Sequence, residues 1–229
     1  MDDDENLKVC KVVLLGETGV GKTCIIDRFI NDNFVDNQKA TGISTFIAKT
    51  MTFDEFQGKS VKYEIWDTAG QEQYRSLNKI FYKDAGVAIL VYDITNENSF
   101  KEIQNYWVNQ IKENAPKDIS KKLYYFKFYF YFFNLVIGLA GNKSDLFDQE
   151  KVNEEEAKNY AKEIGAIFRL TSALTSLGIE ELFKSIGCKI LDPNFKDDEN
   201  QGKDGAKTKG VKLDSQKAQD KTKNKRSCC

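Results

Sequence analysis

The chain has 229 residues, a formal net charge of −1, five cysteines and no histidine. Its length suits one α/β domain with a tail, its balanced charge gives no reason to expect nucleic-acid binding, and the lack of histidine excludes histidine-based catalysis and histidine metal ligands. Two cysteines are adjacent at the terminus and three are scattered, which argues against a disulfide framework and for a reducing compartment.

Strand and helix patterns alternate along most of the chain. In chain order they predict a strand at residues 8–15, a helix at 22–31, strands at 45–53 and 61–66, a short helix after Gln73, a strand at 86–92, a helix at 99–114, a strand at 136–141, a helix at 154–164, a strand at 166–170 and a helix at 179–190. The turn at 54–60 is longer than is usual for a hairpin. Such alternation is typical of parallel βαβ units, so we expect a three-layer α/β fold with a mostly parallel six-stranded sheet and helices on both faces. Ligand-binding loops then lie at the carboxyl ends of the strands.

The first such loop, Gly-Glu-Thr-Gly-Val-Gly-Lys-Thr at residues 16–23, joins the first strand to the first helix. Its glycines let backbone N–H groups surround a β-phosphate at a helix N-terminus. Lys22 reaches the β and γ oxygens, and the Thr23 hydroxyl can coordinate Mg²⁺. The alternative is a chance match in a glycine-containing turn, and the strand before and the helix after argue against it.

The second loop begins with Asp-Thr-Ala-Gly-Gln at residues 67–71. Asp67 ends a strand, where its carboxylate can face Mg²⁺ directly or through water. Gly70 has no side chain, which lets a backbone N–H approach a γ-phosphate, and Gln71 is the group expected to orient the attacking water. Taken alone, Gln71 would be a solvated loop amide; its place after Asp-Thr-Ala-Gly favours the catalytic role.

The third loop, Asn-Lys-Ser-Asp at residues 142–145, follows the predicted strand 136–141. The Asp145 carboxylate can accept two hydrogen bonds, from N1–H and the N2 amine of guanine, and adenine offers no such pair. An ordinary polar turn is the alternative, but the position behind a strand favours base recognition. Together the three loops predict one guanine-nucleotide site that prefers GTP over ATP.

These residues resemble the Ras superfamily and, more narrowly, the Rab family of small GTPases, over most of residues 8–191. The Rab-like details are Trp-Asp-Thr-Ala-Gly-Gln-Glu at 66–72, Phe81-Tyr82, Tyr-Asp-Ile-Thr at 92–95 and the terminal Cys228-Cys229. The resemblance implies the P-loop GTPase fold and is greatest to the endosomal Rab subgroup. In two places the chain departs from the family: Gly42-Ile43 inverts the usual order, and Leu174 replaces a common lysine.

The resemblance also implies roles for individual residues. Phe34 matches the aromatic that packs on the guanine ring, Thr41 matches the switch threonine that senses Mg²⁺ and the γ-phosphate, and the Ala173 N–H would meet guanine O6. The hydrophobic triad that faces effectors corresponds to Phe46, Trp66 and Phe81, for which core packing is the alternative. The implied sets are Lys22, Thr41 and Gln71 for catalysis, Thr23, Thr41 and Asp67 for Mg²⁺, and Gly16, Thr18, Gly19, Val20, Gly21, Lys22, Thr23, Cys24, Phe34, Thr41, Asp67, Gly70, Asn142, Lys143, Asp145, Ser172, Ala173 and Leu174 for the nucleotide.

Two terminal segments flank the predicted domain. Residues 1–7 form an acidic extension without a secretory signal. Residues 192–229 are rich in lysine, aspartate, glycine and glutamine and have almost no large apolar side chains, so we expect disorder. In a Rab-like protein the final Cys228 and Cys229 receive two geranylgeranyl chains, and the neighbouring cations add attraction to an anionic membrane.

One internal segment, residues 120–135, does not fit this scheme, because it is a run of aromatics where a short loop should stand. It is at or below the ~20 apolar residues that span a membrane, and it contains Lys127. Its residues are those of very AT-rich codons, and both of its ends can be written as intron boundaries whose excision preserves the reading frame. We interpret it as a translated intron; an effector-binding hairpin is the alternative.

The sequence thus predicts a Rab-like GTPase that hydrolyses GTP with Mg²⁺ and acts as a membrane-anchored switch in vesicle trafficking. The family implies exchange factors, GTPase-activating proteins, escort and GDP-dissociation-inhibitor proteins, and effectors. It also implies a location on the cytoplasmic face of intracellular membranes, of the endosomal type, together with a soluble cytosolic pool. The alternatives are a non-switching guanine-nucleotide-binding scaffold or a misfolded product, if the 120–135 insert is present, and a phosphate-loop ATP kinase, which would have no use for residues 142–145.

Overall fold

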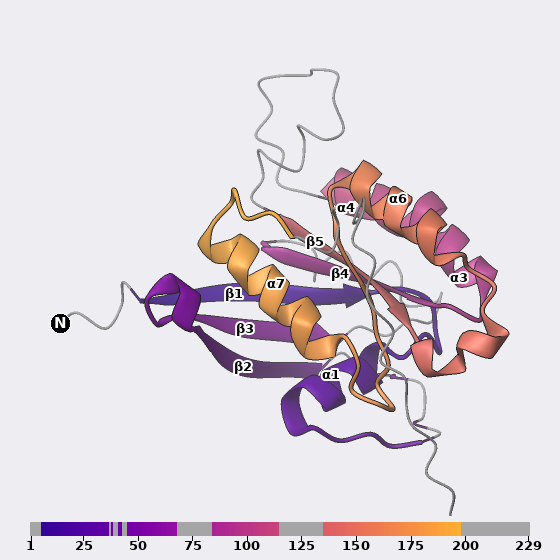
Figure 1. Ribbon diagram of the computed structural model, residues 1–229, viewed down its shortest axis with the longest axis horizontal. Coiled ribbons are helices and arrows are strands. Elements are labelled where there is room, and N and C mark those ends of the chain that lie inside the picture. Colours follow the sequence, from indigo (N-terminus) through magenta and orange to yellow (C-terminus); the bar gives the residue numbers. More distant parts are fainter. Residues whose placement is uncertain are drawn as a thin grey trace, which may run out of the picture.

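The computed structural model describes residues 6–36, 38, 41–42, 45–67, 84–114 and 135–197 (Figure 1). Its strands form one six-stranded sheet in the order β2-β3-β1-β4-β5-β6. They are β1 (Leu7–Leu15), β2 (Thr45–Phe53), β3 (Lys59–Asp67), β4 (Val87–Asp93), β5 (Val136–Asn142) and β6 (Ile167–Leu170). β2 pairs antiparallel with β3, and the other pairings are parallel. The predicted mostly parallel sheet is confirmed.

Helices cover both faces of this sheet (Figure 1). On one face lie α1 (Lys22–Asn31) and α7 (Ile179–Leu191), and on the other lie α3 (Glu97–Glu102), the π-helical turn η3 (Ile103–Trp107), α4 (Val108–Asn114) and α6 (Glu154–Ile164). Side chains of β1 enter the hydrophobic cores on both faces of the sheet, because successive side chains of a strand point to opposite faces. Val12 and Leu14 pack in the core with α1 and α7, and Val13 and Leu15 pack in the other. The three-layer α/β fold is therefore confirmed.

Helix boundaries follow local capping chemistry. α6 begins at the predicted residue because the Asn153 side chain accepts hydrogen bonds from the backbone N–H groups of Glu155 and Glu156. It ends at Gly165, whose φ of 69° is left-handed. α1 and β2 also have the predicted bounds.

Two predictions about element boundaries are wrong. The turn predicted at 54–60 is shorter, because Phe53 pairs with Lys59 and β3 begins there. The 3₁₀ turn η1 (Asp54–Phe56) and two left-handed residues, Gln57 and Gly58, reverse the chain within this length. The helix predicted at 99–114 starts earlier, at α3, because the Asn96 side chain accepts a hydrogen bond from the Asn98 N–H and caps it.

The C-terminal boundary of the domain also lies further along the chain than composition indicates. Arg169 on β6 forms a bidentate ion pair with Asp197, with both N–O distances 2.6 Å, and also donates to the Ser185 hydroxyl at 2.8 Å. Phe195 packs partly buried against the core beneath α7. Residues 192–197, which composition assigns to the tail, therefore pack against the domain.

Several predicted features lie outside the described residues. These are the short helix after Gln73 together with Gly70, Gln71 and Phe81, most of the 120–135 insert, and the terminal Cys228 and Cys229. At the end of the insert, Leu135 packs partly against the core beneath α6, and the Val136 N–H donates to the Gly86 carbonyl at 2.9 Å. Within the described ranges, no helix has both the length and the apolar character that crossing a membrane requires.

Candidate functional site

A cavity of about 730 Å³ opens where the chain leaves the carboxyl ends of β1, β5 and β6. Its lining includes these residues that the sequence predicts: Thr18, Gly19, Gly21, Lys22, Thr23, Cys24, Phe34, Thr41, Asn142, Lys143, Asp145, Ala173 and Leu174. It also includes residues that sequence reasoning missed: Val35, Asp36, Gln38 and Leu146. The remaining predicted residues that the structure describes, Gly16, Val20, Asp67 and Ser172, contact this lining through the hydrogen bonds given below. The loops at 16–23 and 142–145 thus line one cavity, and Asp67, the one residue of the second loop that the structure describes, is bonded to Thr23.

The loop after β1 needs glycine at two positions. A Cβ on Gly16 would lie 2.2 Å from the Val91 carbonyl oxygen, and one on Gly21 would lie 2.3 Å from Asn142 Nδ2. Both residues also have positive φ, 149° and 94°, which disfavours other residue types. The loop can therefore pass close to β4 and β5 and lead directly into the N-terminus of α1, where unpaired backbone N–H groups favour an anion.

Lys22, the first residue of α1, is buried beneath this loop. Its Nζ donates to the carbonyl oxygens of Gly16 at 2.8 Å and Glu17 at 2.9 Å. Burial lowers the pKa of Lys22 to about 8, although the nearby Asp67 and Glu17 carboxylates act in the opposite direction. The ammonium is thus held inside the loop, and a bound phosphate would favour its charged form.

Three oxygen-bearing side chains meet beside Lys22. Thr23 Oγ1 lies 2.6 Å from Thr41 Oγ1 and donates to Asp67 Oδ2 at 2.7 Å, and Thr41 Oγ1 lies 3.4 Å from the same carboxylate oxygen. Burial raises the pKa of Asp67, an effect opposed by the Thr23 hydrogen bond. Asp67 Oδ1 is buried and has no hydrogen-bond partner among the described residues. A buried carboxylate oxygen beside two hydroxyls fits Mg²⁺, which prefers oxygen ligands.

The other end of the cavity is built by the loop after β5. Asn142 ties two loops together, since its Nδ2 donates to the Val20 carbonyl at 2.8 Å and its Oδ1 lies 3.2 Å from Thr171 Oγ1. Lys143, in a left-handed conformation with φ 66°, forms an ion pair of 2.7 Å with Asp93 at the end of β4. Sequence reasoning missed Asp93 as a site residue, although its position at the end of a strand matches those of Asp67 and Asn142.

Asp145 follows in the same loop and contacts the loop after β6. The Ser172 hydroxyl donates to Asp145 Oδ1 at 2.5 Å and accepts a hydrogen bond from the Thr175 N–H at 3.1 Å. Ala173 and Leu174 complete this wall of the cavity, and Phe34 lines it as well. The carboxylate is therefore oriented by a neighbouring loop before any ligand contacts it.

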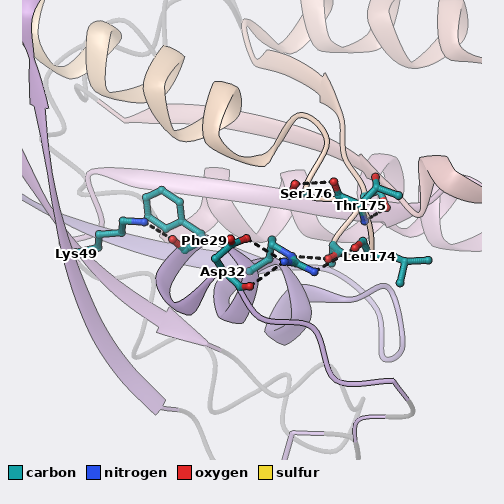
Figure 2. Close-up of polar contacts among 9 residues, drawn as sticks. Phe29, Asp32, Lys49, Leu174, Thr175 and Ser176 are labelled. Atoms are coloured by element: carbon teal, nitrogen blue, oxygen red, sulfur yellow. Dashed lines mark hydrogen bonds and ion pairs between the residues drawn. The ribbon is translucent and has the colours of Figure 1, made fainter.

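Arg28 on α1 also contacts the loop after β6. Its guanidinium donates to the carbonyl oxygens of Ala173 at 2.8 Å and Leu174 at 3.1 Å, while Asp32 is its ion-pair partner (Figure 2). Sequence reasoning missed this residue, because nothing near it in the chain indicates a partner so distant in sequence.

The predicted effector surface is described in part. Phe46 is 51% exposed, so core packing does not explain it, and its ring centroid lies 5.3 Å from that of Trp66. Lys11 Nζ lies 5.5 Å from the centroid of the Trp66 ring. These two aromatics on β2 and β3 form an edge-to-face pair in which Phe46 is exposed and Trp66, partly buried, also packs against the core.

A mostly parallel six-stranded sheet with a phosphate loop after β1 and a base-recognition loop after β5 defines a P-loop GTPase. The sequence model of the Ras family matches residues 11–192. "Ras-related protein Rab-22A" of Homo sapiens is 40% identical over 223 residues, which cover 97% of this chain and 99% of that protein. "Ras-related protein Rab-31" of Mus musculus is 39% identical over 97% of this chain and 98% of that protein, and "Ras-related protein RABF2b" of Arabidopsis thaliana is 39% identical over 79% and 80%.

The chain therefore belongs to the Ras family and, within it, to the Rab small GTPases, which hydrolyse GTP and act in vesicle trafficking. The match extends over nearly the full length of both chains. It does not favour a non-switching scaffold.

Proposed function

We propose that the cavity between α1 and the loops after β5 and β6 holds GTP and GDP, with the phosphates at Lys22 and the base at Asp145. The observation that carries this proposal is that the loops at 16–23 and 142–145 line one cavity, with Asn142 Nδ2 hydrogen-bonded to the Val20 carbonyl between its two ends and Asp67 bonded to Thr23. The phosphate end presents a buried ammonium and a helix N-terminus, and both favour anions.

At the base end, Asp145 accepts the N1–H and N2 amine of guanine, while the Ala173 N–H meets O6 and Phe34 packs on the ring. The hydrogen bond from Ser172 to Asp145 supports this assignment, because it holds the carboxylate in the cavity wall. A site built around this half-buried carboxylate disfavours adenine, which would leave that acceptor without a donor.

The residues that would hold Mg²⁺ are Thr23, Thr41 and Asp67. When bound, the ion neutralises negative charge on the β and γ phosphates. The two threonines approach each other from α1 and from the segment before β2, so both hydroxyls would contact the same bound Mg²⁺. Order in the segment around Thr41 then depends on the γ-phosphate, as a switch requires.

For hydrolysis we propose that Gln71 orients the attacking water while the Lys22 ammonium stabilises charge that develops on the β–γ bridge. Phosphoryl transfer depends on positioning and charge stabilisation more than on a strong base. The hydrogen bonds from Lys22 to the loop carbonyls support this, since they hold the ammonium in place before the phosphates arrive.

We further propose that Cys228 and Cys229 are geranylgeranylated and anchor the protein to the cytoplasmic face of endosomal membranes, with a soluble pool in the cytosol. The relatives named Rab-22A and Rab-31 support this assignment. Exchange factors, GTPase-activating proteins, escort and GDP-dissociation-inhibitor proteins are the partners that Rab proteins use, and effectors would contact Phe46, Trp66 and Phe81.

The 120–135 insert remains, in our proposal, a translated intron. α4 ends at Asn114 and β5 begins at Val136, whose N–H is already bonded to Gly86, so none of the described strands includes a residue of the insert. Messenger RNA sequenced across this region should lack codons 120–135. A mature messenger that retains them would show that the segment belongs to the protein.

Nucleotide binding by the purified protein tests the proposed site directly. Full-length chain and a variant without residues 120–135 should both bind fluorescent GDP, and unlabelled GTP and GDP should displace it. ATP at the same concentrations should not displace fluorescent GDP, because adenine offers Asp145 no pair of hydrogen-bond donors. Displacement by ATP would instead indicate a phosphate-loop ATP kinase.

A further inference from the structure

One guanidinium links the C-terminal end of α1 to the loop after β6, which lines the proposed nucleotide cavity and is far away in sequence. Arg28 Nε donates to the Ala173 carbonyl at 2.8 Å, and Nη2 donates to the Leu174 carbonyl at 3.1 Å. Nη1 donates to both the carbonyl and the carboxylate of Asp32, each at 2.9 Å. The side chain of Arg28 is only 16% exposed, whereas that of Asp32 is 86% exposed. Figure 2 shows Asp32, at the end of α1, and Leu174, in the loop after β6, near one another and each joined by dashed hydrogen bonds.

The cavity is lined by one of the two segments that Arg28 joins, the loop after β6, and the other segment, at Asp32, leads directly to a lining residue. Ala173 and Leu174 line it, and Phe34, which follows Asp32 by two residues, lines it too. Arg28 itself does not line this cavity. Its guanidinium therefore acts on the cavity through the two segments it holds.

Within the loop after β6, Ala173 is buried, and Leu174 is the residue for which the contact with Arg28 matters most. Leu174 is 52% exposed, so packing does little to hold it. The backbone also connects Arg28 to the end of α1, because the Asp32 N–H donates to the Arg28 carbonyl at 3.0 Å. A planar guanidinium with several fixed donors can bond two successive carbonyls and the helix end at once, and a lysine ammonium has no such geometry.

We propose that Arg28 is a positioning residue that sets guanine affinity and selectivity by holding the Ala173–Leu174 carbonyls, and thereby the Ala173 N–H, against the base. This rests on the proposed nucleotide site. The contact should slow GDP release and should do so chiefly through the hydrogen bond at O6.

The test is the dissociation rate of fluorescent GDP and fluorescent 6-thio-GDP from the full chain and from Arg28→Ala. Removing hydrogen bonds made by a charged group should speed GDP release about tenfold. Release of 6-thio-GDP should speed up less, because sulfur at position 6 is a weak acceptor and makes less use of the Ala173 N–H. The discrimination between the two nucleotides should therefore shrink, which a general loss of stability would not produce.

Arg28→Lys is the conservative variant and should lie between the parent and Arg28→Ala; it carries the test if Arg28→Ala does not fold. Asp32→Gly is the matched control, because it removes the exposed carboxylate, keeps the carbonyl and suits the left-handed backbone at φ 49°. Its release rate should stay within about twofold of the parent.

An unchanged GDP release rate in the Arg28 variants would overturn the proposal, and so would an equal acceleration for both nucleotides. A large effect of Asp32→Gly would shift the role to the surface ion pair and would also overturn it. If the parent chain binds no GDP at all, the failure lies in the proposed nucleotide site and not in Arg28 alone.

Discussion

In the proposed function, base selection depends on Asp145. Its Oδ1 already accepts a hydrogen bond from the Ser172 hydroxyl, so the second oxygen and the remaining lone pairs face the cavity that Phe34 and Ala173 also line. A carboxylate oriented in this way by another loop loses little freedom when the base binds. Local contacts of a few side chains thus set the chemistry at each end of the cavity.

Asp145→Ala should therefore weaken GDP and GTP binding by about 2 to 4 kcal/mol, because guanine donors would be left unpaired. Equilibrium titration with fluorescent GDP measures this. Asp148→Ala, in the same 3₁₀ segment (Ser144–Gln149) but exposed and outside the cavity lining, serves as the control and should bind like the parent. Equal affinity in the two variants would remove Asp145 from base recognition.

Gln71→Leu should slow GTP hydrolysis by at least about tenfold while leaving GTP affinity close to that of the parent, since leucine keeps the volume but cannot orient water. Single-turnover hydrolysis and GTP titration separate the two quantities. Thr23→Asn is the contrasting variant and should weaken Mg²⁺ and GTP binding, because it changes the hydroxyl that bonds Asp67. Hydrolysis at the parent rate would show that Gln71 has no part in the mechanism.

At the scale of elements, the β6–α7 unit does two things. The loop between these elements supplies Ser172, Ala173 and Leu174 to the cavity, and β6 itself holds the C-terminal segment through Arg169. The Arg169 and Asp197 side chains are only 8% and 9% exposed, so this ion pair is shielded from water and from salt. It marks where the domain ends and the tail begins.

Asp197→Asn should lower the free energy of unfolding by about 3 kcal/mol, because it takes the carboxylate away from a buried guanidinium. Urea unfolding of the GDP-bound protein measures this. Lys196→Gln also changes one charge but at an exposed neighbouring position, and it should change the unfolding free energy by less than about 0.5 kcal/mol. If both variants unfold at the parent's urea midpoint, the domain ends before residue 197.

At the scale of the whole molecule, the proposed nucleotide site and the proposed lipid anchor are far apart along the chain. The two cores lie on opposite faces of the sheet, and the cavity opens at the carboxyl ends of its strands, within residues 16–174. The terminal cysteines follow Asp197 by more than thirty residues. Changes at the terminus should therefore leave nucleotide binding intact.

Replacing Cys228 and Cys229 together with serine should release the protein from membranes, because two lipid chains, at ~0.8 kcal/mol for each buried CH₂, are needed for stable anchoring. Cell fractionation measures this, with GDP binding as the control that should not change. Replacing one cysteine alone should leave weak, reversible attachment. A double variant that still sediments with membranes would place the anchor elsewhere, with the aromatic segment 124–133 as the first candidate.

Much of the fold was predictable from sequence because its signals are local. The caps at Asn153 and Gly165, the glycines of the phosphate loop and the apolar alternation along β1 each act within a few residues. The hairpin after Phe53 was predicted too long, because strand pairing and left-handed residues decide where β3 begins. The π-helical turn at Ile103–Trp107 was also missed, since it interrupts an otherwise helical pattern.

By itself, the sequence determined the family, the three ligand loops and the chemistry expected of Lys22, Asp67 and Asp145, because each loop carries its donors and acceptors in consecutive residues. Only the tertiary structure decided which distant groups support them. Arg28 meets carbonyls 145 and 146 residues away, Lys143 meets Asp93, and Arg169 meets Asp197. The physical reason is that these partners are backbone carbonyls and single charged side chains, which have no sequence pattern and come together only when the sheet orders its strands.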